Sequence, residues 1–232
     1  MGSLADELLK ELEVETVFSF DVGGYHINIF ESTVITWCIM AFLLVFCIVL
    51  TSGMKVRGQL SRRQIIAETI VTKLDGFVGD MVGEEGHAYV PYLCSVLIYL
   101  ALANTIGVFG LKPPTKDLNS TIALALMSII LIQVANIRAK KVKGWIKSFA
   151  EPIAIVTPIN ILELVIKPLS LCMRLFGNVL GAFVIMELVK IAMKVPVVVP
   201  VVLGAYFDIF DGLIQAYIFV FLTSLFIREV VE

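Results

Sequence analysis

The chain has 232 residues, of which 59% are hydrophobic and only 16% are charged, and its mean hydropathy is +0.94. Soluble domains carry about 25% charged residues, so this composition excludes a soluble globular protein and indicates an integral membrane protein. The apolar residues come in long runs without strict alternation, which favours spanning helices over a membrane β-barrel.

The first 31 residues form an acidic N-terminal segment that lacks the positive charge and apolar core of a secretory signal peptide. The segment is also unlike an organelle transit peptide, which favours a bacterial plasma membrane as the location. A first membrane span is predicted at about residues 33–50, and basic residues follow it. From about 62 to 82, apolar residues recur at helical spacing among polar ones, which predicts an amphipathic helix at the membrane surface.

Two further spans, at about 90–109 and 122–137, are joined by a short proline-rich turn and are expected to form an antiparallel hairpin. The second of them ends in five basic residues, Arg138, Lys140, Lys141, Lys143 and Lys147. Because basic loops remain in the cytoplasm, both basic segments are expected there, with the acidic N-terminus outside. An odd number of spans then places the C-terminus inside.

The last two predicted spans are unusually long. Residues 159–190 as one helix would measure about 48 Å, against about 30 Å for the hydrocarbon core of a bilayer. This helix must tilt strongly, lie partly across the membrane, or break, and a similar long span covers about 201–227. The sequence therefore predicts an all-α polytopic membrane fold. Residues 32–232 form a single domain of about five membrane helices, the last two long and strongly tilted, with one amphipathic surface helix.

Arg174 lies in the middle of the apolar stretch from Ile161 to Ile185. Arginine keeps its charge, and a charge at mid-bilayer depth costs about 2.5 to 3.5 kcal/mol on insertion scales. Such a residue marks a functional site by default, and the structural alternative is an ion pair with Asp208 or Asp211 that pins two helices together. At spacings of three and four, Arg174 shares one helix face with other polar or small residues: Glu163, Lys167, Ser170, Asn178 and Gly181.

A second polar face is predicted on the final span, where Asp208, Asp211 and Gln215 follow one another at spacings of three and four. Carboxylates in apolar surroundings can take up and release protons, so these residues indicate a proton or cation path. Glu187 could continue that path toward the far surface. The four cysteines lie inside apolar runs without metal-ligand spacing and are predicted to be small buried residues, so neither a metal nor a cofactor is expected.

Three stretches carry a resemblance to a known family. They are PPTKDLNST at residues 113–121, KPLSLCMRLFGN at residues 167–178, and QAYIF at residues 215–219. Asn104, followed by Ile106 and Gly107, adds to the pattern. Together these stretches resemble subunit a of F-type ATP synthases, the stator subunit beside the rotating c ring, and the resemblance covers nearly the whole chain.

The resemblance implies an ion-translocating subunit with two half-channels, each open to one side of the membrane, for protons or sodium ions. Arg174 resembles the family's essential arginine, which passes the ring carboxylates and keeps ions from leaking between the half-channels. Asp208 is implied to be a relay residue, and three polar residues are implied to line the ring-facing surface: Ser170, Asn178 and Gln215. Phe183 departs from the family, because many relatives carry a Glu or His there.

The implied partners are the c ring, the peripheral-stalk subunit b and the remaining ATP synthase subunits, with no nucleic acid. The chain shows no phosphate-binding Gly-rich loop, so ATP chemistry is expected in partner subunits and not in this chain alone. The main alternative is a self-contained secondary transporter or channel coupled through Arg174, Asp208 and Asp211, although no internal repeat supports it. An intramembrane hydrolase is a third possibility, but the apolar segments pair no Ser or Cys with a His.

Overall fold

The computed structural model describes residues 16–22, 25–54, 61–149, 154–192 and 198–231. Within them, five helical stretches are long and apolar enough to cross a membrane, which confirms the all-α polytopic fold and makes the chain a multi-pass membrane protein. The stretches are α2 (Glu31–Thr51), α4 (Val90–Thr105) with the 3-10 turn η2 (Ile106–Phe109), α5 (Leu118–Ser148), α6 (Thr157–Ala192), and the continuous run of α7 (Val198–Ala205), the π-helical turn η5 (Tyr206–Asp211) and α8 (Gly212–Val231).

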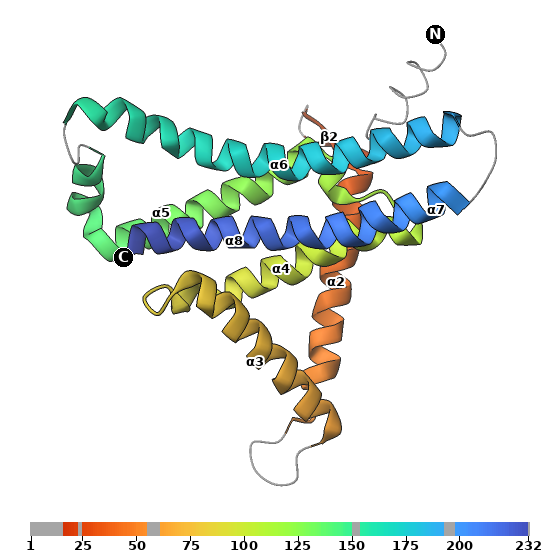
Figure 1. Cartoon of the computed structure of the whole chain (residues 1–232), viewed down its shortest axis with the longest axis horizontal. Helices are drawn as coiled ribbons and strands as arrows, with labels where there is room; N and C mark the ends of the chain where they lie inside the picture. Colours follow the sequence, from red (N-terminus) through yellow and green to blue (C-terminus); the bar gives the residue numbers. More distant parts are fainter. Residues whose placement is uncertain (1–15, 23–24, 55–60, 150–153, 193–197, 232) are drawn as a thin grey trace.

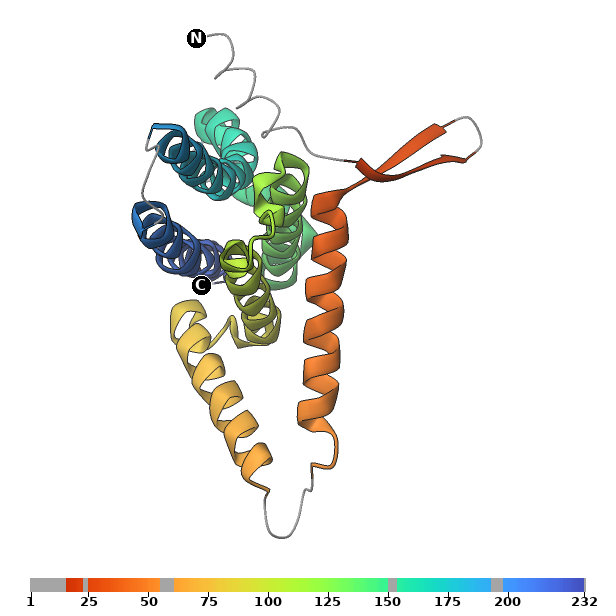
Figure 2. The ribbon, with the colours of Figure 1, turned by 90° about the vertical axis from the view of Figure 1, so that its right-hand side faces the viewer.

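Four of these helices pack side by side into one bundle, as Figure 1 shows along their length and Figure 2 shows end on. Helices α4, α5, α6 and α8 supply nearly all of its buried apolar side chains. The contacts between α4 and α8, and between α5 and α6, are the most extensive. The tightest packing comes from fully buried residues on each helix, including Leu93, Leu100, Ile132, Leu171, Leu175 and Ile227.

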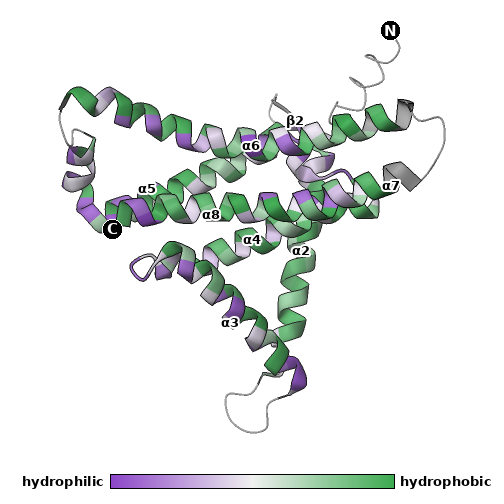
Figure 3. Ribbon diagram, viewed as in Figure 1, coloured by the Kyte–Doolittle hydropathy of each residue, from purple (hydrophilic) through white to green (hydrophobic). Residues whose placement is uncertain are grey.

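Helix α2 crosses this bundle instead of joining it (Figures 1 and 2). Its surface is apolar nearly all round (Figure 3), and most of its large apolar side chains are exposed, which requires lipid around them. Cys38 and Cys47 are exposed on this helix, so the prediction that all cysteines are buried was wrong for these two. If α2 crosses the bilayer along its axis, α6 and α8 lie strongly inclined in it.

Polar contacts at the N-terminal end of α2 attach it to the bundle. Ser32 Oγ donates to Asp117 Oδ2 at 2.6 Å, and Lys112 Nζ lies 3.5 Å from Glu31 Oε2. One turn further, the hydroxyls of Thr36 and Tyr99 are 3.2 Å apart. These contacts all lie within the first two turns of α2, which leaves its remaining length without comparable polar anchors among the described residues.

The helix predicted to be amphipathic is α3 (Arg62–Val82), with the bounds that the periodicity predicts. Its buried residues, Ala67, Val78 and Val82, face the bundle, while Ile66 and Ile70 are exposed beside polar neighbours. An exposed apolar side on a helix that is otherwise polar suits the interface between lipid headgroups and hydrocarbon.

Helix α5 is longer than the predicted span of 122–137. It begins at Leu118 because Asp117 Oδ1 accepts a hydrogen bond from the backbone N–H of Asn119 at 2.9 Å, which caps the helix. It continues through the basic residues to Ser148, with an abrupt bend at Lys141, whose φ is 59°. The short arm beyond the bend is held back against the helix by Trp145 Nε1, which donates to Gln133 Oε1 at 2.9 Å.

A β-hairpin precedes α2 and was not predicted. Strands β1 (Thr16–Val22) and β2 (Tyr25–Phe30) pair antiparallel, with Phe18 opposite Ile29 and Asp21 opposite His26. The hairpin projects away from the helices (Figure 2). The signal for it was present, since apolar residues alternate on both sides of the sequence Gly23-Gly24. The acidic cluster at the start of the chain lies outside the described residues.

Candidate functional site

Arg174 lies on the exposed side of α6. The side of α6 that packs into the bundle carries Leu171, Cys172 and Leu175, which are at most 4% exposed. Arg174 and its stripe neighbours Ser170 and Asn178 are all exposed. Because a charge facing lipid at this depth is costly, this side of α6 must be covered by water or by another protein.

Gln215 reaches Arg174 from the neighbouring helix. It is only 5% exposed on α8, and it lines a narrow crevice together with Arg174, Leu171, Leu175 and Phe219. Within the described part of the chain, Arg174 forms no ion pair with Asp208 or Asp211, which line a different cavity. The geometry therefore does not support a structural ion pair between Arg174 and either aspartate.

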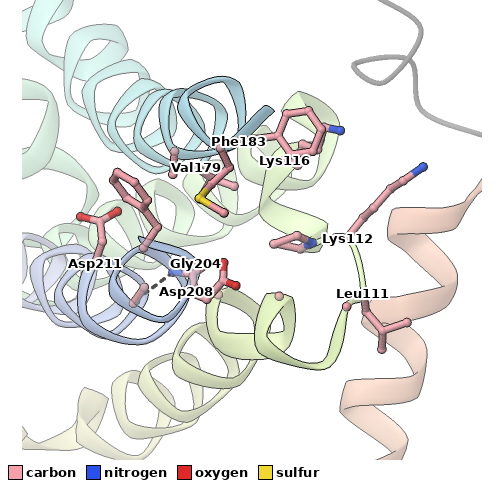
Figure 4. A pocket seen from close by; sticks show the side chains of 16 residues that line it. Leu111, Lys112, Lys116, Val179, Phe183, Gly204, Asp208 and Asp211 are labelled. Carbon is pink, nitrogen blue, oxygen red and sulfur yellow. Dashed lines mark hydrogen bonds between the residues drawn. The ribbon is translucent and has the colours of Figure 1, made fainter. Parts of the chain in front are cut away.

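A cavity of about 280 Å³ lies beyond Arg174 along α6, and we name it the Asp208 cavity. Its walls come from the end of α4, the connection between η2 and α5, the C-terminal half of α6, and the η5 turn. Figure 4 shows the side chains that line it. The charged ones are Lys112, Lys116, Asp208 and Asp211.

The two aspartates do not point the same way. Figure 4 shows Asp208 pointing toward the end of α4 and Asp211 turned in another direction from the same turn. Both lie in η5, whose π-helical hydrogen bonding widens the turn and changes the angular register of the side chains. Asp208 and Asp211 line the Asp208 cavity, whereas Gln215, further along on α8, lies beside Arg174.

Asp208 lies directly against the backbone of Gly107. A Cβ atom at position 107 would come within 2.5 Å of Asp208 Oδ1, so the carboxylate occupies space that any other residue would fill. Gly107 lies in η2, directly after α4. The position of the Asp208 carboxylate against η2 therefore depends on glycine at this position.

Asn104 fixes η5 relative to α4. Its Nδ2 donates to the carbonyl oxygen of Gly212 at 3.1 Å, and its Oδ1 accepts from Thr115 Oγ1 at 2.8 Å. Asn104 and Thr115 are 3% and 1% exposed. Their buried polar network joins α4, η3 (Pro114–Lys116) and the junction of η5 with α8, and it positions the turn that carries the two aspartates.

Phe183 also lines the Asp208 cavity. Lys116 Nζ lies 3.4 Å from the centre of the Phe183 ring, a cation–π contact, and Figure 4 shows the two side chains next to each other. The positive charge of Lys116 therefore lies against Phe183, the residue at which the sequence departs from its family resemblance. Glu187 continues along α6, but its side chain lies outside the described residues.

A second cavity of about 230 Å³, which we name the Lys167 cavity, lies on the opposite side of Arg174. It is lined from α5, the start of α6 and the end of α8 by polar residues including Asn136, Asn160, Glu163, Lys167 and Glu229. Lys167 Nζ lies 3.0 Å from Glu229 Oε2 and 3.6 Å from Glu163 Oε2. Sequence spacing identified Glu163 and Lys167, but not Glu229, which only the fold brings near them.

The two cavities flank Arg174 along one helix. At 1.5 Å per residue, Lys167 lies about 10 Å before Arg174 and Phe183 about 13 Å after it. Both cavities contain carboxylates and lysines, which are groups able to hold protons or cations. Among the residues that the structure describes, no three His, Cys, Asp or Glu side chains gather as a metal site.

The sequence also matches a known family. The family described as ATP synthase A chain matches residues 33–228. The chain is 35% identical over 214 residues to "ATP synthase subunit a 2" of Bradyrhizobium sp., covering 91% of this chain and 92% of that protein. It is 32% identical over 222 residues to "ATP synthase subunit a" of Moorella thermoacetica, covering 94% and 98%. It is 31% identical over 222 residues to "ATP synthase subunit a, sodium ion specific" of Propionigenium modestum, covering 89% and 75%.

These matches extend over most of the chain, and the family match includes Arg174, the Asp208 cavity, most of the Lys167 cavity and most of each helix long enough to span a membrane. The chain therefore belongs to the ATP synthase A chain family.

Proposed function

We propose that the chain is the ion-translocating stator subunit of the membrane sector of an ATP synthase. It provides two half-channels that lead a proton or sodium ion to and from carboxylates on a rotating c ring. The observation that carries the proposal is the exposed Arg174 between two polar cavities on the same helix. The chain performs no chemistry on ATP in this proposal.

The Asp208 cavity and the Lys167 cavity are the proposed half-channels. A single continuous pore would connect them, whereas here the crevice of Arg174 and Gln215 lies between them, walled by Leu171, Leu175 and Phe219. An ion that enters one cavity must therefore leave the chain, travel on the ring and return at the other cavity. That detour couples ion flow to rotation.

Arg174 acts on the ring carboxylate in this mechanism. A carboxylate that has lost its ion passes the guanidinium in its charged form, because an opposite charge within a few ångströms stabilises the carboxylate. Arginine does not lose its proton, so the barrier to cations between the two cavities stays in place throughout the cycle. Gln215 positions the guanidinium, and Ser170 and Asn178 extend the same exposed polar face toward the ring.

The membrane orientation follows from the basic residues. The Lys167 cavity is lined by Ser148 and Phe149, directly after the five basic residues of α5, so it opens to the cytoplasm. The Asp208 cavity includes residues of the connection between α4 and α5, at the end of α5 opposite the five basic residues, so in this proposal it opens on the outer side. In this proposal the N-terminus lies outside and the C-terminus inside a bacterial plasma membrane, with subunit b and the remaining subunits as further partners.

The experiment that tests the proposal is ATP-driven ion uptake into everted vesicles that contain the assembled complex. Arg174→Ala is expected to abolish uptake while the complex still assembles, whereas Arg138→Ala, which removes an exposed arginine from α5, is expected to leave uptake unchanged. Varying sodium at fixed pH identifies the ion. Uptake that persists in Arg174→Ala contradicts the proposal and favours a self-contained transporter.

The two aspartates are tested in the same vesicles. Asp208→Asn and Asp211→Asn are each expected to slow ion uptake without uncoupling it from ATP hydrolysis, because both carboxylates line the outer cavity. If neither substitution changes the rate, these residues are not part of the ion path.

A further inference from the structure

Glu229 lies near the end of α8, at the edge of the Lys167 cavity. It is separated from Lys167 by 62 positions in the sequence, yet its Oε2 accepts a hydrogen bond from Lys167 Nζ at 3.0 Å. The Glu229 side chain is 56% exposed and the Lys167 side chain is 22% exposed. Glu229 therefore stands between the solvent and the lysine that lies deeper in the cavity.

Lys167 is held by more than one group. Glu163 Oε2 lies 3.6 Å from Nζ, and the Phe226 ring centre lies 5.0 Å away. Two carboxylates and one ammonium group leave this cluster with one net negative charge. A negative cluster at the opening of a polar cavity raises the local concentration of cations.

The cavity has the size and lining for water. At about 30 Å³ per molecule, 230 Å³ holds roughly seven waters. Asn136 lines the cavity, and its Oδ1 is shielded from bulk solvent without a hydrogen-bond partner among the described residues. A buried amide oxygen normally has a partner, so we expect water in the cavity to donate a hydrogen bond to it.

We propose that Glu229 is the residue that captures the coupling ion from the cytoplasm, with Lys167 as its positioning residue. The inference rests on the proposed function, because it assumes that the Lys167 cavity is the cytoplasmic half-channel. In ATP-driven uptake, the Glu229 carboxylate binds a cation from the medium and passes it through the cavity water toward Arg174. If the ion is a proton, hydronium protonates the carboxylate, and the neutral acid then returns the proton to cavity water and regains its charge.

Lys167 serves two purposes here. It holds the carboxylate at the cavity opening, and its charge keeps the cluster from binding the cation too tightly to release it. It also lies on the same face of α6 as Ser170 and Arg174, two helical turns or about 10 Å from Arg174. The captured ion therefore begins its passage on the polar side of the helix that leads to the ring.

The test uses everted vesicles with the assembled complex, in which the medium bathes the cytoplasmic side. Initial rates of ATP-driven uptake are measured against proton concentration, and against sodium at fixed pH. Glu229→Gln is expected to raise the half-saturating ion concentration about fivefold, equivalent to about 1 kcal/mol at 1.36 kcal/mol per factor of ten. Glu229→Asp should restore most of the lost affinity. Asp80→Asn, which removes an exposed carboxylate of α3 that does not line the cavity, should change nothing.

The outcomes separate the possibilities. If Glu229→Gln lowers only the amount of assembled complex or the maximal rate, Glu229 is a structural contact between α6 and α8 and the inference is overturned. If Arg174→Ala abolishes uptake while Glu229→Gln keeps the wild-type ion dependence, the inference fails and the proposed function stands. If Arg174→Ala retains uptake, both fail.

Discussion

Asn104 offers the sharpest test of how the site is held together. We expect Asn104→Leu to lower the free energy of unfolding, because it removes both hydrogen bonds that join α4, Thr115 and the carbonyl of Gly212. Each buried group left without a partner costs about 1 to 3 kcal/mol, so the two together cost about 2 to 6 kcal/mol. Hydrogen bonds between membrane helices average nearer 0.6 kcal/mol, which favours the lower end, about 2 kcal/mol.

Thr115→Val separates the two bonds. It leaves Asn104 bound to Gly212 and removes only the 2.8 Å bond to Oδ1, so about half of the loss is expected. The assay is equilibrium unfolding of the full chain in mixed micelles with increasing SDS, followed by tryptophan fluorescence. Asn178→Leu makes the same chemical change at an exposed position and should stay within about 0.5 kcal/mol of wild type.

The double variant that carries both Asn104→Leu and Thr115→Val measures how strongly the two residues are coupled. Because Asn104 and Thr115 contact each other directly, the losses should not add, and the double variant should resemble Asn104→Leu alone. Full additivity, or a loss in Asn104→Leu no larger than in Asn178→Leu, would refute the view that this network holds η5 in place.

Three further predictions follow from the same structure. Gly107→Ala is expected to slow ion uptake in assembled complexes, because the new Cβ would lie 2.5 Å from Asp208 Oδ1 and displace the carboxylate, while Gly76→Ala, where the added Cβ meets nothing within 4 Å, should be silent. Asp117→Ala should lower the midpoint of SDS unfolding, because it removes the cap of α5, which contributes about 1 kcal/mol, and the hydrogen bond from Ser32 of α2. An unchanged midpoint would contradict the stabilising role of Asp117. Lys141→Gly should raise the midpoint, because a non-glycine residue at φ 59° and ψ 163° carries about 1 to 3 kcal/mol of backbone strain, and a lower midpoint would show that the bend is not strained.

Much of the fold follows from local patterns in the sequence. Hydropathy and helical periodicity are properties of neighbouring residues, and they located α2, α3 and α6 to within about two residues of the observed ends. The ends of α5 were less predictable, since its start depends on the Asp117 cap and its extension beyond the membrane span is polar. The N-terminal hairpin was not predicted, because the alternation around Gly23-Gly24 is short and follows a segment of acidic composition.

The residues of the candidate site were also predictable from the sequence only in part. Arg174 could be found from the sequence, since a permanent charge inside an apolar run is anomalous wherever the helix packs. Glu229 could not, because its significance comes from Lys167, which is 62 positions away in the chain. The prediction that Asp208, Asp211 and Gln215 share one face assumed regular α-helical geometry, and η5 interrupts that geometry.

The sequence by itself determined that this is a polytopic helical membrane protein with a charge at membrane depth, because burial of a helix in lipid depends on the composition of that one segment. Only the tertiary structure decided what lies around the charge. It separated Arg174 from the aspartates, placed a cavity on each side of it, and joined Asn104 to Gly212 across 108 positions. These relations depend on how helices cross and on which turn departs from the α-helical register, and no local pattern records either property.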